Sequence, residues 1–124
     1  MMVSSAQNRA PRDGVFGEGC GTRVVLDHIM SRWGVLVLCA LSDGTLRWSE
    51  LRRQVDGISE KMLASTLRTL ASDGLVHRDS LPSVPPHVEY SLTPLGRDLM
   101  EQMLPLVAWI ADHADAMVGS SSAR

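Results

Sequence analysis

The chain has 124 residues, of which 44% are hydrophobic and 21% charged, and its formal net charge at pH 7 is −2. A chain of this length can bury a core without disulfide bonds, and this charge balance excludes a uniformly polycationic protein. The longest apolar run, residues 35–41, is too short to span a membrane, and the N-terminus lacks the pattern of a secretory signal. We therefore expect one domain in the cytoplasm, with no membrane partner.

Both ends of the chain differ in composition from its middle. Residues 1–19 are polar and rich in glycine, which predicts a flexible N-terminal tail. The domain itself is expected over residues 20–118, followed by a short C-terminal tail at residues 119–124. Cys20 and Cys39 are too few for a disulfide framework, as is usual in a reducing cytoplasm.

Two helices are predicted at the start of the domain. Thr22 is expected to cap the first, whose apolar face is formed by Val25, Leu26, Ile29 and Met30. Residues 33–41 are apolar nearly all round, which indicates a buried helix. Gly44 suits the turn that ends it.

A helix-turn-helix pattern comes next. Residues 45–48 alternate as in a small strand, and Ser49 is expected to cap a short helix that ends near Val55. A turn at Gly57 leads to a second helix over residues 59–72, capped by Ser59. Its buried stripe is predicted to contain Met62, Leu63, Leu67 and Leu70.

A β-hairpin and a long helix complete the domain. Residues 75–79 and 88–92 are predicted strands around a loop that contains Pro82, Pro85 and Pro86, and adjacent prolines cannot make ladder hydrogen bonds. The loop should therefore project as a wing. Thr93 is expected to cap the last helix, with Pro94 in its first position, and Pro105 should kink or interrupt it.

The outer face of the second helix of the motif carries the chemistry expected of a DNA reader. When Leu63, Leu67 and Leu70 face the core, Lys61, Ser65, Arg68 and Ser72 share another face, flanked by Ser59, Glu60 and Thr66. Any bundle has a solvated polar face of this kind. The preceding helix, the Gly turn and the following hairpin favour a winged helix-turn-helix instead, whose second helix enters the major groove.

Basic residues around this helix are candidates for phosphate contacts. Arg52 and Arg53 lie on the preceding predicted helix, whereas Arg78 and His87 lie in the wing. Residues 45–68 contain five basic and three acidic side chains, and the last predicted helix is acidic. This asymmetry is typical of a nucleic-acid contact face, although each arginine could equally be a solvated surface residue.

Several motifs make the chain similar to a known family. They are WSELRR from Trp48, GISEKML from Gly57, LRTL from Leu67, DGLV from Asp73 and VPPHVEYSLTPLG from Val84. Over residues 20–113 the chain resembles the HxlR-type regulators, small bacterial winged helix-turn-helix proteins related in fold to the MarR regulators. The resemblance implies a mainly α fold with a β-hairpin wing. It implies a recognition helix at residues 59–72, and N- and C-terminal helices that form a homodimer.

The last predicted helix supports a dimer on physical grounds as well. It keeps apolar residues beyond what one small domain needs, including Trp109, Ile110 and Met117. Together with Val25 of the first helix, these are the predicted interface residues. In a two-fold dimer the recognition helices should lie about 34 Å apart, and the operator should be an inverted repeat.

Two sensing sites remain as alternatives. Several members of the resembling family carry a cysteine at the place of Cys20 and respond to oxidants or electrophiles. Thiols near helix N-termini tend to be acidified, so Cys20 could act as a redox sensor, whereas Cys39 is expected to pack in the core. An effector pocket could also form between the first and last helices, although packing is the competing interpretation. Its candidate residues are Trp33, Trp48, Trp109, Met30, Met100 and Met103.

No enzyme motif accompanies these features. The four histidines show no metal-ligand spacing, and no nucleophile–base pair or phosphate-binding glycine loop is present. We therefore expect no enzyme activity, no metal and no cofactor. The sequence predicts a DNA-binding transcriptional regulator, and the resemblance alone implies that it acts as a repressor. A winged helix used for protein–protein contact, or a regulator dominated by a small-molecule or redox signal, remains the alternative.

Overall fold

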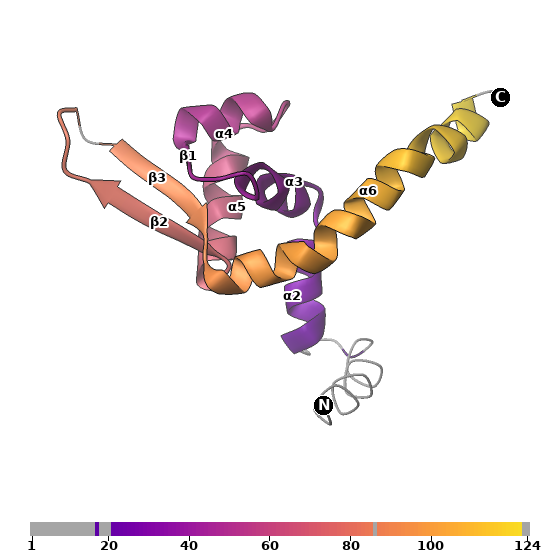
Figure 1. The fold of residues 1–124 in the computed structure, drawn as a ribbon, viewed down its shortest axis with the longest axis horizontal. Helices are drawn as coiled ribbons and strands as arrows, with labels where there is room; N and C mark the ends of the chain where they lie inside the picture. The colour runs from indigo at the N-terminus through magenta and orange to yellow at the C-terminus, as the bar shows by residue number, and fades with distance from the viewer. Residues whose placement is uncertain (1–16, 18–20, 86, 123–124) are drawn as a thin grey trace.

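The computed structural model describes residue 17, residues 21–85 and residues 87–122, with the side chains of residues 119–122 left out. The described helices are α2 (Gly21–Ile29), α3 (Arg32–Leu41), α4 (Trp48–Gln54), α5 (Glu60–Ser72) and α6 (Pro94–Ser122). The strands are β1 (Leu46–Arg47), β2 (Val76–Leu81) and β3 (His87–Leu92) (Figure 1). The predicted fold class, mainly α with a small hairpin wing, is confirmed. Cys20, Pro86 and the predicted N-terminal tail, apart from residue 17, lie outside the described residues.

The three strands form one antiparallel sheet in the order β1-β3-β2. β2 and β3 make the predicted hairpin, in which Val76 pairs with Leu92 and Arg78 with Tyr90. The short strand β1 adds to the other edge of β3, where Leu46 pairs with Tyr90. The hairpin is therefore anchored next to the start of α4, and its far end projects from the body (Figure 1).

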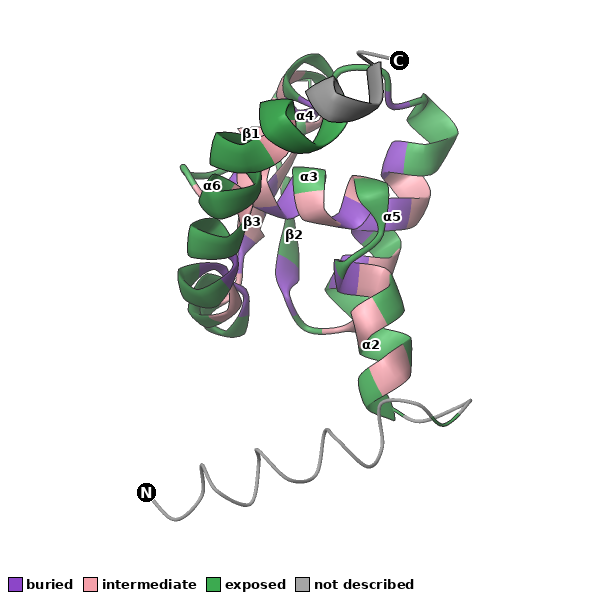
Figure 2. Cartoon of the chain, turned by 90° about the vertical axis from the view of Figure 1, so that its right-hand side faces the viewer, coloured by how far each residue is buried: buried purple, intermediate pink, exposed green. Residues whose placement is uncertain are grey.

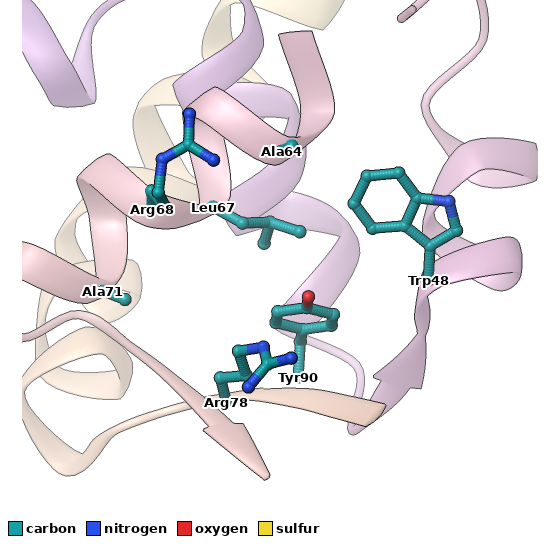
Figure 3. Close-up of a pocket in the computed structure, with 7 residues that line it drawn as sticks. All are labelled: Trp48, Ala64, Leu67, Arg68, Ala71, Arg78 and Tyr90. Carbon is teal, nitrogen blue, oxygen red and sulfur yellow. The ribbon is translucent and has the colours of Figure 1, made fainter. Parts of the chain in front are cut away.

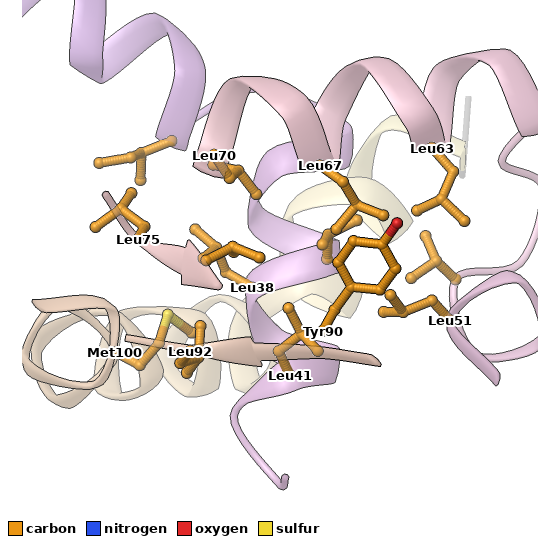
Figure 4. Packing of buried hydrophobic residues seen from close by; sticks show 14 of the residues in the cluster. Leu38, Leu41, Leu51, Leu63, Leu67, Leu70, Leu75, Tyr90, Leu92 and Met100 are labelled. Atoms are coloured by element: carbon orange, nitrogen blue, oxygen red, sulfur yellow. The ribbon is translucent and has the colours of Figure 1, made fainter. Parts of the chain in front are cut away.

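The core gathers around α3, which lies between α5, α6 and the sheet. Its Val37, Leu38 and Leu41 are buried, and they belong to one cluster with leucines of α4 and α5 and with Met100 of α6 (Figure 4). Fully burying one such side chain contributes about 1.5–3 kcal/mol. This cluster holds α5 at a defined angle to the wing.

Two predicted caps are confirmed. The Ser59 Oγ atom accepts a hydrogen bond from the Met62 backbone N–H at 3.0 Å, and Thr93 Oγ1 accepts one from the Gly96 N–H at 3.0 Å. The Thr93 hydroxyl also donates to the Gly74 carbonyl at 2.6 Å. The start of α6 is thereby attached to the turn between α5 and β2.

Two other predicted caps are wrong. α2 begins at Gly21, so Thr22 lies inside the helix rather than before it. α4 begins at Trp48, because the Glu50 carboxylate accepts a hydrogen bond from the Arg47 N–H at 2.8 Å and so defines Arg47 as the cap. Ser49 therefore occupies a helical position. A cap that the sequence analysis did not name is Ser31, whose Oγ accepts from the Gly34 N–H at 3.1 Å.

The last helix is not interrupted at Pro105. α6 runs through this residue as one helix, whose ribbon bends along its length (Figure 1). Pro105 is exposed, so water can reach the carbonyl group that the proline leaves without an N–H partner. On the same helix Met100 and Met103 are buried in the core, and this removes them from the predicted effector pocket.

No single helix in the described part of the chain has the length and apolar composition of a membrane span. Only α2 and α3 taken together pass such a test, and they are bent by 69° relative to each other.

Candidate nucleic-acid interface

The helix-turn-helix is formed by α4, α5 and the turn between them. Gly57 has φ of +90°, a conformation that favours glycine, and it reverses the chain directly after α4. Ile58 is buried beneath this turn, and Ser59 then starts α5. The predicted stripe of α5 is confirmed for Leu63, Leu67 and Leu70, but Met62 is 41% exposed and does not belong to it.

The opposite side of α5 presents its basic residues to solvent. Lys61 and Arg68 are exposed, and Ser65 between them is half-buried. Neither basic side chain forms an ion pair with another described residue. The predicted outer face of α5 thus presents two exposed cations with a small residue between them.

Thr66 does not belong to this exposed face. It was predicted to flank the DNA-reading surface, but it is only 9% exposed and lies on the side of α5 that faces α2. The reason is geometric: Thr66 is three residues after Leu63 and four before Leu70, so it borders the buried stripe. A helical wheel gives the direction of the Thr66 side chain around the axis of α5, but only the packing of α2 shows that this side of α5 is covered.

The two arginines of α4 are both exposed, but their surroundings differ. The Arg52 guanidinium donates to the Glu60 carboxylate at 2.9 Å and so links α4 to the first turn of α5. This pair lies at the surface, where ion pairs typically contribute about 0–1 kcal/mol. Arg53 forms no ion pair with any described residue, so its charge is available to an anionic partner.

The wing holds its two basic residues in different ways. Arg78 is exposed on β2, and its guanidinium donates to Ser80 Oγ at 3.3 Å. His87 turns inward: its Nδ1 lies 2.9 Å from Ser83 Oγ, and its Nε2 lies 3.5 Å from the Glu89 carboxylate. The buried Nε2 atom makes no hydrogen bond with another described residue. His87 is therefore placed to order the wing loop, in contrast to the predicted role of a direct phosphate contact.

This arrangement of helix-turn-helix and wing agrees with a known sequence profile. Residues 28–118 match the profile described as "HxlR-like helix-turn-helix". The chain belongs to the HxlR-like helix-turn-helix family. The family resemblance inferred from the motifs is thereby confirmed.

Similar proteins extend this assignment. YtfH of Escherichia coli strain K12, described as an HTH-type transcriptional regulator, is 51% identical over 110 residues, which are 89% of this chain and 87% of YtfH. The solved structure of YtfH from Salmonella typhimurium has a TM-score of 0.80 and 50% identity, and the match covers 87% of this chain and 96% of that one. The oxidized form of the redox regulator HypR has a TM-score of 0.69 and 39% identity, with 75% and 96% covered. The chain therefore carries the helix-turn-helix domain of a transcriptional regulator.

In this HxlR-like protein, α2 is tied directly to the C-terminal end of α5. The His28 Nδ1 atom lies 2.7 Å from a carboxylate oxygen of Asp73, which caps α5. The contact joins residues 45 positions apart, and the Asp73 side chain is only 14% exposed. A movement of α2 would therefore act on the end of α5. No sequence pattern predicted this contact between His28 and Asp73.

The structure describes one of the two cysteines of this HxlR-like chain. Cys20, the predicted redox sensor, lies outside the described residues. Cys39 is half-buried on α3 and packs against the core, as predicted, and burial raises the pKa of its thiol above its ordinary value of 9.0. Little of Cys39 is therefore present as the reactive thiolate at neutral pH.

Proposed function

We propose that this protein is a homodimeric, DNA-binding transcriptional repressor that acts in the cytoplasm on an inverted-repeat operator. The observation that carries the proposal is the exposed, unpaired Lys61 and Arg68 edge of a capped helix next to a projecting wing. α5 has 13 residues and so extends about 20 Å, and an α-helix with its side chains is about 10–12 Å across, which fits the major-groove width of about 12 Å.

The contacts divide into two groups. Residues on α5 are proposed to meet base edges: Ser59 at its N-terminus, then Lys61, Ser65 and Arg68. Arg52 and Arg53 of α4 and Arg78 of the wing are proposed to contact phosphates, which position the protein but do not read sequence. Thr66 is left out because it is buried, and His87 is proposed to hold the wing loop in shape.

The homodimer is supported by apolar side chains left exposed on α2 and α6. Val25 is 39% exposed, Trp109 52%, Ile110 45% and Met117 50%. Other exposed apolar residues of the same two helices are Val24, Leu104, Leu106 and Val118. Much of the surface of these helices is exposed in the single chain (Figure 2). Soluble monomers rarely leave so many large apolar side chains exposed, and a second copy with two-fold symmetry would cover them.

Replacing Arg68 by alanine is expected to relax the sequence preference of DNA binding. A bidentate contact to a base edge contributes about 1–3 kcal/mol of discrimination, so the preference for the operator over a mutated operator should fall about 5- to 150-fold. Titration of both duplexes by gel shift or fluorescence anisotropy measures this ratio. The DNA upstream of the protein's own gene is the first operator to use.

Arg53→Ala is the matched comparison for Arg68→Ala. A lost phosphate contact should weaken all sequences alike and lower the slope of log K against log salt by about 0.9. An unchanged preference in Arg68→Ala would contradict the reading role of α5. If the parent protein bound no DNA with a salt-dependent affinity, the winged helix would serve a protein partner instead.

Redox sensing through Cys20 is a second candidate function. It is supported by the similarity to HypR, a redox regulator whose oxidized and reduced forms both resemble this chain. Cys20→Ser is expected to keep the protein on DNA in the presence of diamide, because the remaining thiol, Cys39, is half-buried and has a raised pKa. The parent protein should release DNA under the same conditions. Release of DNA by Cys20→Ser as readily as by the parent would exclude Cys20 as the trigger.

A further inference from the structure

The wing contains a histidine whose two ring nitrogens have different surroundings. The Nδ1 atom of His87 lies 2.9 Å from Ser83 Oγ, and its Nε2 atom lies 3.5 Å from a carboxylate oxygen of Glu89. Nε2 is the buried side-chain nitrogen that has no hydrogen-bond partner among the described residues. Buried polar atoms normally have such a partner. The wing therefore keeps one unsatisfied nitrogen directly beside a carboxylate.

Hydrogen bonds within the wing loop determine which nitrogen carries the proton of the neutral ring. The Ser83 hydroxyl donates its single proton to the Pro85 carbonyl at 2.6 Å. Ser83 Oγ can then only accept from His87, so Nδ1 is the protonated nitrogen. The neutral ring consequently presents the lone pair of Nε2 to the Glu89 carboxylate, which is also an acceptor. This contact becomes favourable only when Nε2 gains a proton.

His87 and Glu89 lie on the face of the hairpin that is turned away from α5. Side chains alternate along a strand, and register partners on adjacent strands share a face. The face toward α5 carries Arg78 and Tyr90, which line a hollow of about 340 Å³ together with Trp48 and Arg68 (Figure 3). The contact between His87 and Glu89 is therefore separate from this hollow.

The strands on both sides of Glu89 bring further charges to the outer face. Glu89 pairs in register with Asp79 of β2 and with Arg47 of β1. No ion pair joins these three residues to one another. When His87 is neutral, the face carries two negative charges and one positive charge. One proton on His87 therefore removes the net negative charge of this part of the wing.

The other residues near the ring carry no charge that would change this balance. Leu81 lies opposite His87 on β2, and a shallow hollow beside the ring is lined by Trp48, Ser49, Val88 and Tyr90, in addition to Arg47. The titratable His77 shares the outer face but lies four residues from Leu81, which is about 13 Å along β2. Glu89 is therefore the charged group that a proton on Nε2 meets first.

We propose that His87 and Glu89 form a pH-sensitive switch in the wing, in which Nε2 takes up a proton from solvent, pairs with Glu89 and strengthens binding to the operator. Histidine is the side chain whose ordinary change of charge falls between pH 5 and 8. The effect on DNA rests on the proposed function. The closed pair fixes the wing loop, and a face without net negative charge no longer repels phosphates. Operator affinity therefore rises as the pH falls.

The positions of the protons are tested first without DNA, by NMR of the full-length protein labelled with ¹⁵N and ¹³C. At pH 8 the His87 ring is expected to carry its proton on Nδ1, and Nε2 should gain a proton as the pH falls. The Glu89 carboxyl carbon should change its chemical shift together with His87, and this response should be absent in His87→Gln. A proton on Nε2 at pH 8, or the same Glu89 response in His87→Gln, would overturn the proposal.

Ser83→Ala tests why the proton lies on Nδ1. Without Ser83 Oγ, Nδ1 has no acceptor, whereas a proton on Nε2 can be donated to Glu89. The neutral ring should then carry its proton on Nε2 at pH 8. An unchanged spectrum would contradict the role given to Ser83 and, with it, the unfavourable contact on which the switch depends.

The effect on DNA is measured as the gain in operator affinity between pH 8 and pH 6 at constant salt concentration, by fluorescence anisotropy. The side chains of His87 and Glu89 are 25% and 33% exposed, so the gain should be about fivefold larger in the parent than in His87→Gln. Glu89→Gln should lose the same gain, because its amide is uncharged and can donate to the neutral ring. His77→Gln is the matched control and should keep the gain. Circular dichroism confirms that each variant folds.

The outcomes separate the switch from other effects of pH. Equal gains in the parent and in His87→Gln would overturn the proposal. If Glu89→Gln kept the gain that His87→Gln loses, protonated His87 would contact a phosphate directly, and the pair with Glu89 would be rejected. An equal loss in His77→Gln would indicate a general effect of charge and also contradict the switch. If the parent bound no DNA, the proposed function would fail, whereas the NMR experiment still decides whether His87 and Glu89 form the pair.

Discussion

Replacing Trp109 and Ile110 together by glutamate is expected to produce a monomer and to weaken operator binding about 100-fold or more. Both side chains are about half exposed on α6 in the single chain, so the change should leave the fold intact. At the proposed interface, however, it would place four carboxylates in an apolar contact, where unpaired charge is strongly unfavourable. The loss of operator affinity follows from valency, because linking two DNA-binding domains raises the affinity by roughly 10²–10⁴ without any new contact.

Sedimentation equilibrium measures the mass of this double variant, and anisotropy with a full and a half operator measures the DNA effect. The control is Leu95→Glu, which changes another exposed apolar residue at the opposite end of α6. An acidic side chain in the first turn of a helix is favourable, so this variant should remain dimeric and folded. A dimeric double variant with normal operator affinity would show that α6 is not the interface.

Gly96→Ala is expected to destabilise the protein by more than about 2 kcal/mol, which lowers Tm by roughly 10 °C. In an ordinary helix this substitution is favourable by about 1 kcal/mol, since alanine has the higher helix propensity. Here a Cβ atom would lie 2.2 Å from the Leu75 carbonyl oxygen. That oxygen already accepts a hydrogen bond from the Thr93 N–H at 3.0 Å, so the backbone cannot move aside without losing it. The close approach of α6 to the start of the hairpin therefore requires glycine.

Gly21→Ala is the matched control for this prediction. Gly21 also lies in a helix, and no atom of the described residues comes within 4 Å of the Cβ atom that alanine would add. Its Tm should stay within a few degrees of the parent. Thermal unfolding followed by circular dichroism compares the two variants directly. Equal Tm values for Gly96→Ala and the parent would mean that the junction of α6 with Leu75 is looser than the structure indicates.

Local signals along the chain were sufficient to predict most of the elements. The caps Ser59 and Thr93, the turn at Gly57 and the hairpin were all expected, because each depends on residues within a few positions of one another. The same dependence on nearby residues led to the wrong prediction that Ser49 caps α4. A serine in a suitable position competes with a Glu50 carboxylate that reaches back to Arg47, and only the folded geometry shows which cap forms.

The candidate site could be predicted in part. The exposed Lys61 and Arg68 follow from the wheel of α5, since residues three and four apart share a face. Burial of Thr66 depends on α2, which is far away in sequence and covers one side of that wheel. The inward orientation of His87 depends on Ser83 and Glu89 within the closed wing. Neither the burial of Thr66 nor the orientation of His87 corresponds to a sequence pattern from which it could be predicted.

The sequence by itself determined the family, the order of helices and strands, and the basic edge of α5, because these are written in short motifs and periodicities. Only the tertiary structure decided which side of α5 is covered, that His28 meets Asp73, and that Trp48, Arg68, Arg78 and Tyr90 surround one hollow. The physical reason is that side chains from four separate elements meet only after α3 has packed against α5, α6 and the sheet. Their spacing in space is then set by the core and not by their separation along the chain.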